Sequence, residues 1–251
     1  MTKANVSLVA FYGDKPVELV NLISTLQTHL ANHSLLGDKF IPYRLEQIHG
    51  TIIGCEGYKT DSGIASRWFK ERRQATKYIN IPGLIDHTQQ IDLPLTIRFG
   101  GYNRQTDYNF LSRGQPLSDR SFQLQVTENY TIPVLIGWSW QDNTVTLAID
   151  NLRRSFQQFG LLHKYHTHPD SIDNDFYLRL GTINTQLSKE EIDLVATNIR
   201  TLLSTSSVSI PIKIGDLAFA QYQDLQLTPA TTKIIFASSI TASQLKQLYI
   251  S

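Results

Sequence analysis

The chain has 251 residues, of which 41% are hydrophobic and 18% are charged, and 23 basic against 22 acidic residues give a formal net charge of +1. This composition is typical of a folded protein with a sizeable core, and it excludes an intrinsically disordered chain. The near balance of charges excludes a protein whose whole surface coats nucleic acid, so any affinity for phosphate must be local.

Cysteine content and hydropathy indicate the cellular compartment. Cys55 is the single cysteine, so it cannot form an internal disulfide, and its apolar neighbours predict a buried thiol. The N-terminus lacks the apolar run of a secretory signal, and no segment approaches the roughly 20 apolar residues of a membrane helix. We therefore expect a cytoplasmic protein without a membrane partner.

The first part of the chain predicts a strand, a helix and a second strand. Residues 4–13 are rich in β-branched and aromatic side chains and end in glycine, which is typical of a strand. Residues 14–33 repeat leucine and isoleucine at helical spacing, with Asp14 and Pro16 at the start. Residues 46–57, with the sequence EQIHGTIIGCEG, then read as a buried strand.

The middle of the chain alternates irregular segments and strands. Residues 58–92 include a stretch that Ser62 could cap as a helix. Residues 93–102 predict a strand, and the polar residues 103–120 predict a loop or a hairpin. Residues 121–140 predict two strands joined by a turn.

The last part of the chain contains the clearest helices. Residues 143–160 carry apolar side chains on one helical face, with Gly160 placed for a left-handed C-cap. Residues 176–183 read as a strand, and residues 188–206 begin with a capping-box pattern. Two further strand segments and a short helix that begins at Thr241 complete the chain. This order suggests two similar lobes within one domain, residues 1–251.

One pair of side chains in the second strand could carry chemistry. Side chains at positions i and i+2 of a strand share a face, so His49 and Thr51 project together. A histidine can move a proton near neutral pH while a hydroxyl holds a phosphate oxygen. Taken alone, the pattern is more often a half-exposed histidine beside a threonine that favours β structure.

The order of elements over residues 1–240, with HGTI near residue 50 and FYLRLG at 176–181, resembles the 2H phosphoesterase superfamily, which includes bacterial RNA 2′,3′-cyclic phosphodiesterases. The resemblance implies a bilobal α+β fold in which antiparallel sheets line a central cleft and helices lie outside. It also implies an H-x-T/S motif on each lobe. One histidine acts as base and the other as acid on a cyclic or 2′–5′ phosphodiester, the hydroxyls bind the phosphate, and no metal or cofactor is required.

The second motif departs from the family pattern. Tyr177 stands at the position of the histidine, and Arg179 stands at the position of the threonine. A tyrosine with a pKa of about 10 is a poor base at neutral pH, although it can donate a hydrogen bond. An arginine binds phosphate through a planar fork of donors. The substitution therefore keeps phosphate binding and weakens acid–base exchange, unless Tyr177 packs at an edge and Arg179 is a solvated surface charge.

A histidine-rich loop lies just upstream, in the sequence HKYHTHPD. One of His163, His166 and His168 could enter the cleft and replace the missing histidine. The following aspartates also allow a metal site, but the spacing matches no zinc signature, and we assign no metal. Solvated histidines and carboxylates are the more common explanation of such a loop.

Two basic and aromatic stretches could contact RNA or a nucleotide, because arginine binds phosphate and aromatic rings stack on bases. One is residues 67–73, RWFKERR, for which an amphipathic helix is the more common explanation. The other is the loop that contains Arg104, Tyr108 and Arg113.

The sequence thus predicts a 2H phosphoesterase-like protein that acts on a cyclic or 2′-phosphorylated nucleotide or an RNA end. His49, Thr51 and Tyr177 would form the catalytic group, and Thr51 and Arg179 would bind phosphate. The alternative is a non-catalytic protein that binds a nucleotide or RNA in the same cleft, so whether the chain is an enzyme stays open. No protein partner is indicated.

Overall fold

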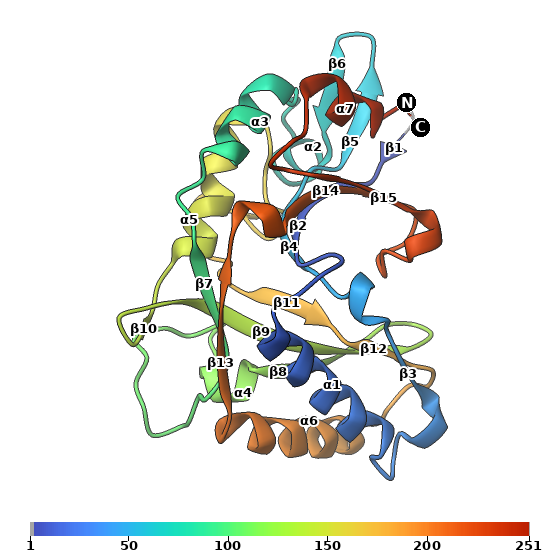
Figure 1. The fold of residues 1–251 in the computed structure, drawn as a ribbon, viewed down its shortest axis with the longest axis vertical. Coiled ribbons are helices and arrows are strands. Elements are labelled where there is room, and N and C mark those ends of the chain that lie inside the picture. Colours follow the sequence, from blue (N-terminus) through green and yellow to red (C-terminus); the bar gives the residue numbers. More distant parts are fainter. Residues whose placement is uncertain (1–2, 251) are drawn as a thin grey trace.

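The structure is a computed structural model that describes residues 3–250, so residues 1, 2 and 251 of the predicted domain lie outside the described part. It has an α+β architecture in which all pairs of the named strands are antiparallel (Figure 1). The helices are α1 (Val17–Ala31), α2 (Arg67–Arg73), α3 (Ile81–Gln89), α4 (Leu117–Arg120), α5 (Ala148–Ser155), α6 (Lys189–Ser204) and α7 (Ala242–Gln247). The strands are β1 (Lys3–Ala4), β2 (Val6–Ala10), β3 (Phe40–Pro42), β4 (Gly50–Gly54), β5 (Gly57–Thr60), β6 (Gly63–Ser66), β7 (Leu95–Gly100), β8 (Phe122–Val126), β9 (Thr131–Gln141), β10 (Thr144–Val145), β11 (Phe176–Arg179), β12 (Gly181–Ile183), β13 (Ser207–Ile212), β14 (Leu217–Tyr222) and β15 (Thr232–Phe236).

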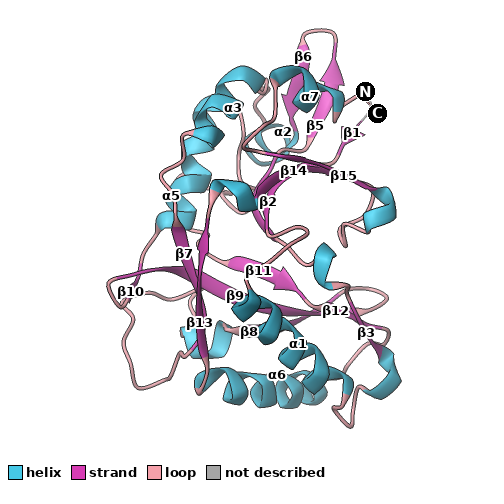
Figure 2. Ribbon diagram, in the orientation of Figure 1, coloured by secondary structure: helices cyan, strands magenta, loops and turns pink. Residues whose placement is uncertain are grey.

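The strands form two main sheets and a small one. The largest has eight strands, in the order β13-β7-β9-β12-β3, with β8, β10 and β11 also paired to the long strand β9. A four-stranded sheet has the order β15-β14-β2-β4, and β1, β5 and β6 form a three-stranded sheet. Figure 1 shows the four-stranded sheet above the eight-stranded one, with β11 at the level between them. The helices lie around the sheets, with α1 and α6 along the lower side (Figure 2).

Local sequence signals fix several element boundaries as predicted. The N-terminus of α6 has the capping box, in which the Ser188 side chain accepts from the Glu191 amide and Glu191 returns a bond to Ser188. The helix α7 begins at Thr241 in the same way. Cys55 is buried, as expected from its apolar neighbours. Within residues 3–250, none of the helices combines the length and the apolar character that crossing a bilayer requires.

Two element predictions are wrong in part. The helix predicted over residues 143–160 begins later than expected, at Ala148 of α5, because Asp142 and Asn143 adopt positive φ angles and turn the chain so that β10 pairs back on β9. Aspartate and asparagine tolerate the left-handed conformation that such a two-residue hairpin needs. The end of the helix is as predicted, since a 3-10 turn over Phe156–Phe159 follows α5 and Gly160 forms the left-handed C-cap. The strand predicted over residues 46–57 is also interrupted. A 3-10 turn covers Leu45–Gln47, and β4 begins only after His49.

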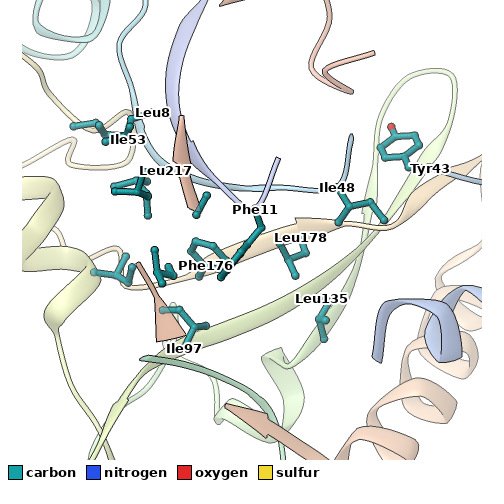
Figure 3. Packing of buried hydrophobic residues seen from close by; sticks show 14 of the residues in the cluster. Leu8, Phe11, Tyr43, Ile48, Ile53, Ile97, Leu135, Phe176, Leu178 and Leu217 are labelled. Atoms are coloured by element: carbon teal, nitrogen blue, oxygen red, sulfur yellow. The ribbon is translucent and has the colours of Figure 1, made fainter. Parts of the chain in front are cut away.

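The main hydrophobic core joins the two large sheets through Phe176 of β11. Its ring meets the ring of Phe11 edge-on, with 6.3 Å between ring centroids, and both lie near the middle of the cluster in Figure 3. Gly50 of β4 lies directly against the Phe176 ring, so that a Cβ atom at this position would overlap it. The glycine between His49 and Thr51 is therefore needed for the close approach of β4 to β11.

A β-bulge shapes the edge strand β4. Val9 of β2 pairs with Thr51, whereas the neighbouring Leu8 pairs with Ile53, so Ile52 is an extra residue in β4. The bulge buries both Ile52 and Ile53. It also leaves backbone carbonyl groups at the sheet edge without strand partners, and such groups need other donors when they are buried.

Arg153 of α5 supplies those donors, although its side chain is only 2% exposed. Its guanidinium donates to the carbonyl oxygens of Thr51 (3.1 Å) and Ile52 (2.9 Å) in β4. It also donates to the carbonyl oxygens of Asp173 (2.8 Å) and Asp175 (3.0 Å), in the segment that leads into β11. One side chain therefore connects the edge of the four-stranded sheet to the segment before β11.

Replacing Arg153 with methionine should lower the free energy of unfolding by about 3–5 kcal/mol, the usual effect of breaking a buried charged network. The variant leaves Asp173 buried without its Arg153 partner, from which it lies 3.6 Å away. Urea denaturation followed by circular dichroism measures the change. The matched control is Arg104→Met, because Arg104 pairs with Asp119 but its side chain is 74% exposed. An equal decrease in the free energy of unfolding in the two variants would contradict the role given to Arg153.

Candidate functional site

A single cleft is lined by residues from both large sheets. The four-stranded sheet contributes β2, β4 and β14, and the eight-stranded sheet contributes β8, β9 and β11. Its lining includes His49 and Thr51 together with Tyr177 and Arg179. The structure thus brings together the residues of both motifs, which are more than a hundred positions apart in the sequence.

His49 lies at the entrance to β4 in a fixed orientation. Its Nδ1 atom lies 2.7 Å from the carbonyl oxygen of Gln47. Because a carbonyl can only accept, Nδ1 carries the proton, and Nε2 of the neutral ring is an acceptor. Burial lowers the pKa of His49 to about 4, and the nearby charges of Arg179 and Lys15 act in the same direction against the Gln47 hydrogen bond. His49 is therefore a neutral base at pH 7.

Thr51 lines the cleft two positions further along. Its backbone carbonyl is taken by Arg153, and no hydrogen bond to its hydroxyl occurs among residues 3–250. The flanking residues Ile48 and Ile52 are buried in the core, so the side chains alternate around this point as expected for a strand. The Thr51 hydroxyl is consequently available to a ligand in the cleft.

The hydroxyl of Tyr177, on the opposite strand β11, is already hydrogen-bonded to neighbouring side chains. This hydroxyl donates to the carboxylate of Asp175 (2.7 Å) and accepts a hydrogen bond from Arg120 (3.1 Å). Burial, followed by the charge of Asp175, raises the pKa of Tyr177 well above its usual value. The one hydroxyl proton therefore points to Asp175 rather than to a ligand.

Arg179, unlike Tyr177, is largely free to interact with a ligand. It is half-buried, lines the cleft, and donates one hydrogen bond to the carbonyl oxygen of Leu225 (3.3 Å). Its positive charge helps to lower the pKa of His49, and it opposes the rise that burial causes in the pKa of Tyr43. Arg179 has no salt bridge within residues 3–250, so its charge and its remaining donors can meet an anionic ligand.

The three histidines of the upstream loop have separate environments. The Nε2 atom of His163 lies 2.7 Å from the carboxylate of Asp173, and that of His166 lies 2.8 Å from Asp150. His168 is exposed. The explanation of a solvated loop is therefore wrong for the first two histidines, because each is buried against an aspartate. No group of three potential metal-ligating side chains gathers in the described residues.

Of the three histidines, His163 lines the cleft. Burial lowers its pKa to about 3, and the charge of Arg153 acts in the same direction. The ring is thus a second neutral imidazole in the same cleft as His49, oriented by a carboxylate.

The loop residues expected to contact a substrate lie in different places. Arg104 pairs with Asp119 at the surface, and Tyr108 packs against Tyr102 and against Trp140 of β9. Neither lines the cleft. Arg113 borders it. Its guanidinium lies 4.4 Å from the ring centroid of Tyr165 and 5.7 Å from that of Tyr177, two residues of the cleft lining.

Sequence reasoning missed Arg153, the residue that connects β4 to the segment before β11 on the two sides of the cleft. A signal was present, because Arg153 lies four residues after Ile149 and three before Phe156, on the apolar face of the predicted helix. A charged side chain on such a face indicates a buried, fully hydrogen-bonded group. Reasoning from sequence also missed Glu56 and Tyr222, which line the cleft beyond Thr51, whereas Trp68, which lies beside them, belongs to the stretch 67–73 that was considered for contact with a ligand.

The chain matches no protein-family model and no curated protein. Two solved structures are similar over most of its length. TT0787 of Thermus thermophilus has 11% sequence identity and a TM-score of 0.41, covering 92% of this chain and 93% of that chain. ATU0111 of Agrobacterium tumefaciens, a conserved protein of unknown function, has 13% identity and a TM-score of 0.42, covering 89% and 82%. Both scores lie below 0.5, so neither structure assigns the chain to a family.

The lowered pKa values of His49 and His163 predict a loss of stability in mild acid. The unfolded chain binds these protons near pH 6.5, whereas the folded chain binds them only near pH 4 and below. Between these values the unfolded state holds more protons, so the free energy of unfolding falls as pH falls, by up to about 1.4 kcal/mol per pH unit for each histidine. Urea denaturation from pH 7.5 to pH 4 measures the slope.

The His49→Asn variant should have a shallower slope over this range than the wild type. His168→Asn is the control, because His168 is exposed and should leave the slope unchanged. The same slope in His49→Asn and the wild type would show that His49 takes up its proton equally well in both states.

Proposed function

We propose that the protein is 2H phosphoesterase-like and that its cleft binds the phosphate of a cyclic or 2′-phosphorylated nucleotide or of an RNA end. The observation that supports this most strongly is that His49, Thr51, Tyr177 and Arg179 line one cleft. His49 and Thr51 come from the start of a strand in one sheet, and Tyr177 and Arg179 come from a strand of another. This is the arrangement expected from the resemblance of the two motif strands to the superfamily.

Each wall contributes a different interaction with phosphate. Arg179 offers a permanent positive charge and a planar set of donors, which match two phosphate oxygens at once. The Thr51 hydroxyl can donate to a third oxygen. The Nε2 atom of His49 accepts a hydrogen bond from a ligand hydroxyl or a water molecule. The combination suits a phosphate that has a neighbouring hydroxyl group or an attacking water.

The geometry favours binding over turnover by the family mechanism. That mechanism needs one group that accepts a proton and one that donates a proton to the leaving oxygen. His49 meets the first need, but the proton of Tyr177 is held by Asp175 and its pKa is raised. A missing general acid or base typically lowers a rate by about 10²–10⁴-fold. The best-supported function is therefore nucleotide or RNA-end binding with little hydrolysis.

Hydrolysis is the second candidate because His163 lines the same cleft and is oriented by Asp173. Such an imidazole could transfer a proton in place of the family's second histidine. Incubating the purified protein with 2′,3′-cyclic nucleotides and short RNAs distinguishes the candidates. Turnover that is lost in both His49→Ala and His163→Ala would establish the hydrolase, whereas binding without turnover establishes the binding protein.

Replacing Arg179 with glutamine should weaken binding of 2′,3′-cyclic nucleotides by at least about tenfold, since a charged hydrogen bond is worth about 1.5–3 kcal/mol. Isothermal titration calorimetry measures the dissociation constants. Arg104→Gln is the matched control, because Arg104 lies at the surface away from the cleft and should leave affinity unchanged. Unchanged affinity in Arg179→Gln would remove Arg179 from the phosphate site.

A further inference from the structure

The cleft continues along β4 beyond Thr51 to a buried carboxylate, that of Glu56. This part of the lining consists of Ser7, Gly54, Glu56, Trp68 and Tyr222, which we call the Glu56 end of the cleft. It lies away from the phosphate-binding side chains, and the proposed binding of phosphate leaves it unused. It offers a negatively charged hydrogen-bond acceptor, whereas Arg179 offers a positively charged donor.

Glu56 is 8% exposed and is held by neutral donors. Its Oε2 atom accepts a hydrogen bond from the Trp68 indole (2.7 Å), and its Oε1 atom accepts a longer one from the Tyr222 hydroxyl (3.4 Å). The Tyr222 hydroxyl is also within 3.2 Å of the Ser7 hydroxyl, so Ser7 can donate to Tyr222 while Tyr222 donates to Glu56.

The Glu56 carboxylate has no salt bridge within residues 3–250. Arg67 interacts with it electrostatically, but the Arg67 guanidinium donates its hydrogen bond to Glu71 (2.7 Å). A buried carboxylate without a cationic partner is costly, and each of its oxygens can accept one more hydrogen bond. The two oxygens thus form an unfilled pair of acceptors in the cleft wall.

The position of the carboxylate is set by Gly54. The Glu56 side chain folds back against Gly54, where a Cβ atom would collide with Oε2. Because of the bulge at Ile52, Gly54 and Thr51 both line the cleft. They are three residues apart along β4, but they pair with Val9 and Ser7, which are only two residues apart along β2, so at about 3.3 Å per residue the carboxylate lies about 7 Å from Thr51. With a hydrogen bond of about 3 Å at each end, this span allows the phosphate and the base edge of one nucleotide to reach Thr51 and Glu56 together.

We propose that the Glu56 end binds the base of the nucleotide and selects guanine. A carboxylate pairs best with two adjacent donors, and guanine offers its ring N1–H beside its 2-amino group. Adenine and cytosine place an acceptor nitrogen beside their amino group, and the single N–H of uracil lies between two carbonyl oxygens, which repel a carboxylate. This specificity rests on the proposed function, because it requires the phosphate of the same nucleotide to bind at Arg179.

The test compares dissociation constants of the 2′,3′-cyclic phosphates of guanosine, inosine, adenosine and uridine, measured by calorimetry. The wild type should bind the guanosine compound at least about tenfold more tightly than the adenosine and uridine compounds, as expected for one bidentate contact. Inosine keeps N1–H and lacks the 2-amino group, so its affinity should fall between these limits. In Glu56→Gln the preference should disappear, because guanosine loses its bidentate contact and uridine no longer faces a negative charge.

The outcomes separate this inference from the proposed function. Equal wild-type affinities for the four compounds, all weakened in Arg179→Gln, would overturn guanine selection and leave phosphate binding intact. No measurable binding of any compound would overturn both. A purely structural Glu56 would lower the melting temperature of Glu56→Gln but leave the ratio of guanosine to uridine affinity unchanged, and that ratio decides the question. If the variant does not fold, the wild type still decides: equal affinities for the guanosine and uridine compounds overturn the inference.

Discussion

The cleft depends on the hydrogen bonds that the buried Arg153 guanidinium makes to the backbone on both of its sides. Two of these bonds reach the bulged edge of β4, and two reach the segment before β11. Desolvating a guanidinium is costly, and here backbone carbonyls and the Asp173 carboxylate compensate that cost. The result is a fixed separation between the strand that carries Thr51 and the strand that carries Arg179. Phe176, packed on Gly50, fixes the same separation on the apolar side.

The titratable groups around the cleft are held in defined protonation states. His49 is neutral because its ring is largely desolvated and the charge of Arg179 also lowers its pKa, and Tyr177 keeps its proton because Asp175 accepts its hydrogen bond. Arg179 adds a positive charge that makes no salt bridge within residues 3–250. Such a set is well suited to holding an anion beside a hydrogen-bond acceptor. It is poorly suited to the repeated exchange of protons that two matched histidines would provide.

Local signals in the sequence predicted much of this structure. The capping box at Ser188 set the start of α6, and the i and i+2 spacing of His49 and Thr51 placed both in the cleft lining. The α+β class with antiparallel sheets was expected from the resemblance of the element order to the 2H phosphoesterase superfamily. The bulge at Ile52 could not be predicted, because it depends on pairing with β2 rather than on the residue itself. The burial of His163 likewise depends on Asp173, which lies ten residues further along the chain.

The central claim is that the two walls bind one phosphate between them. A crystal structure of the protein with a 2′,3′-cyclic nucleotide tests it most directly. The account predicts phosphate oxygens within hydrogen-bond distance of the Arg179 guanidinium and the Thr51 hydroxyl, with Nε2 of His49 facing the ribose oxygens or a bound water. A nucleotide bound outside the cleft, or within it but with its phosphate away from Arg179, would contradict the account.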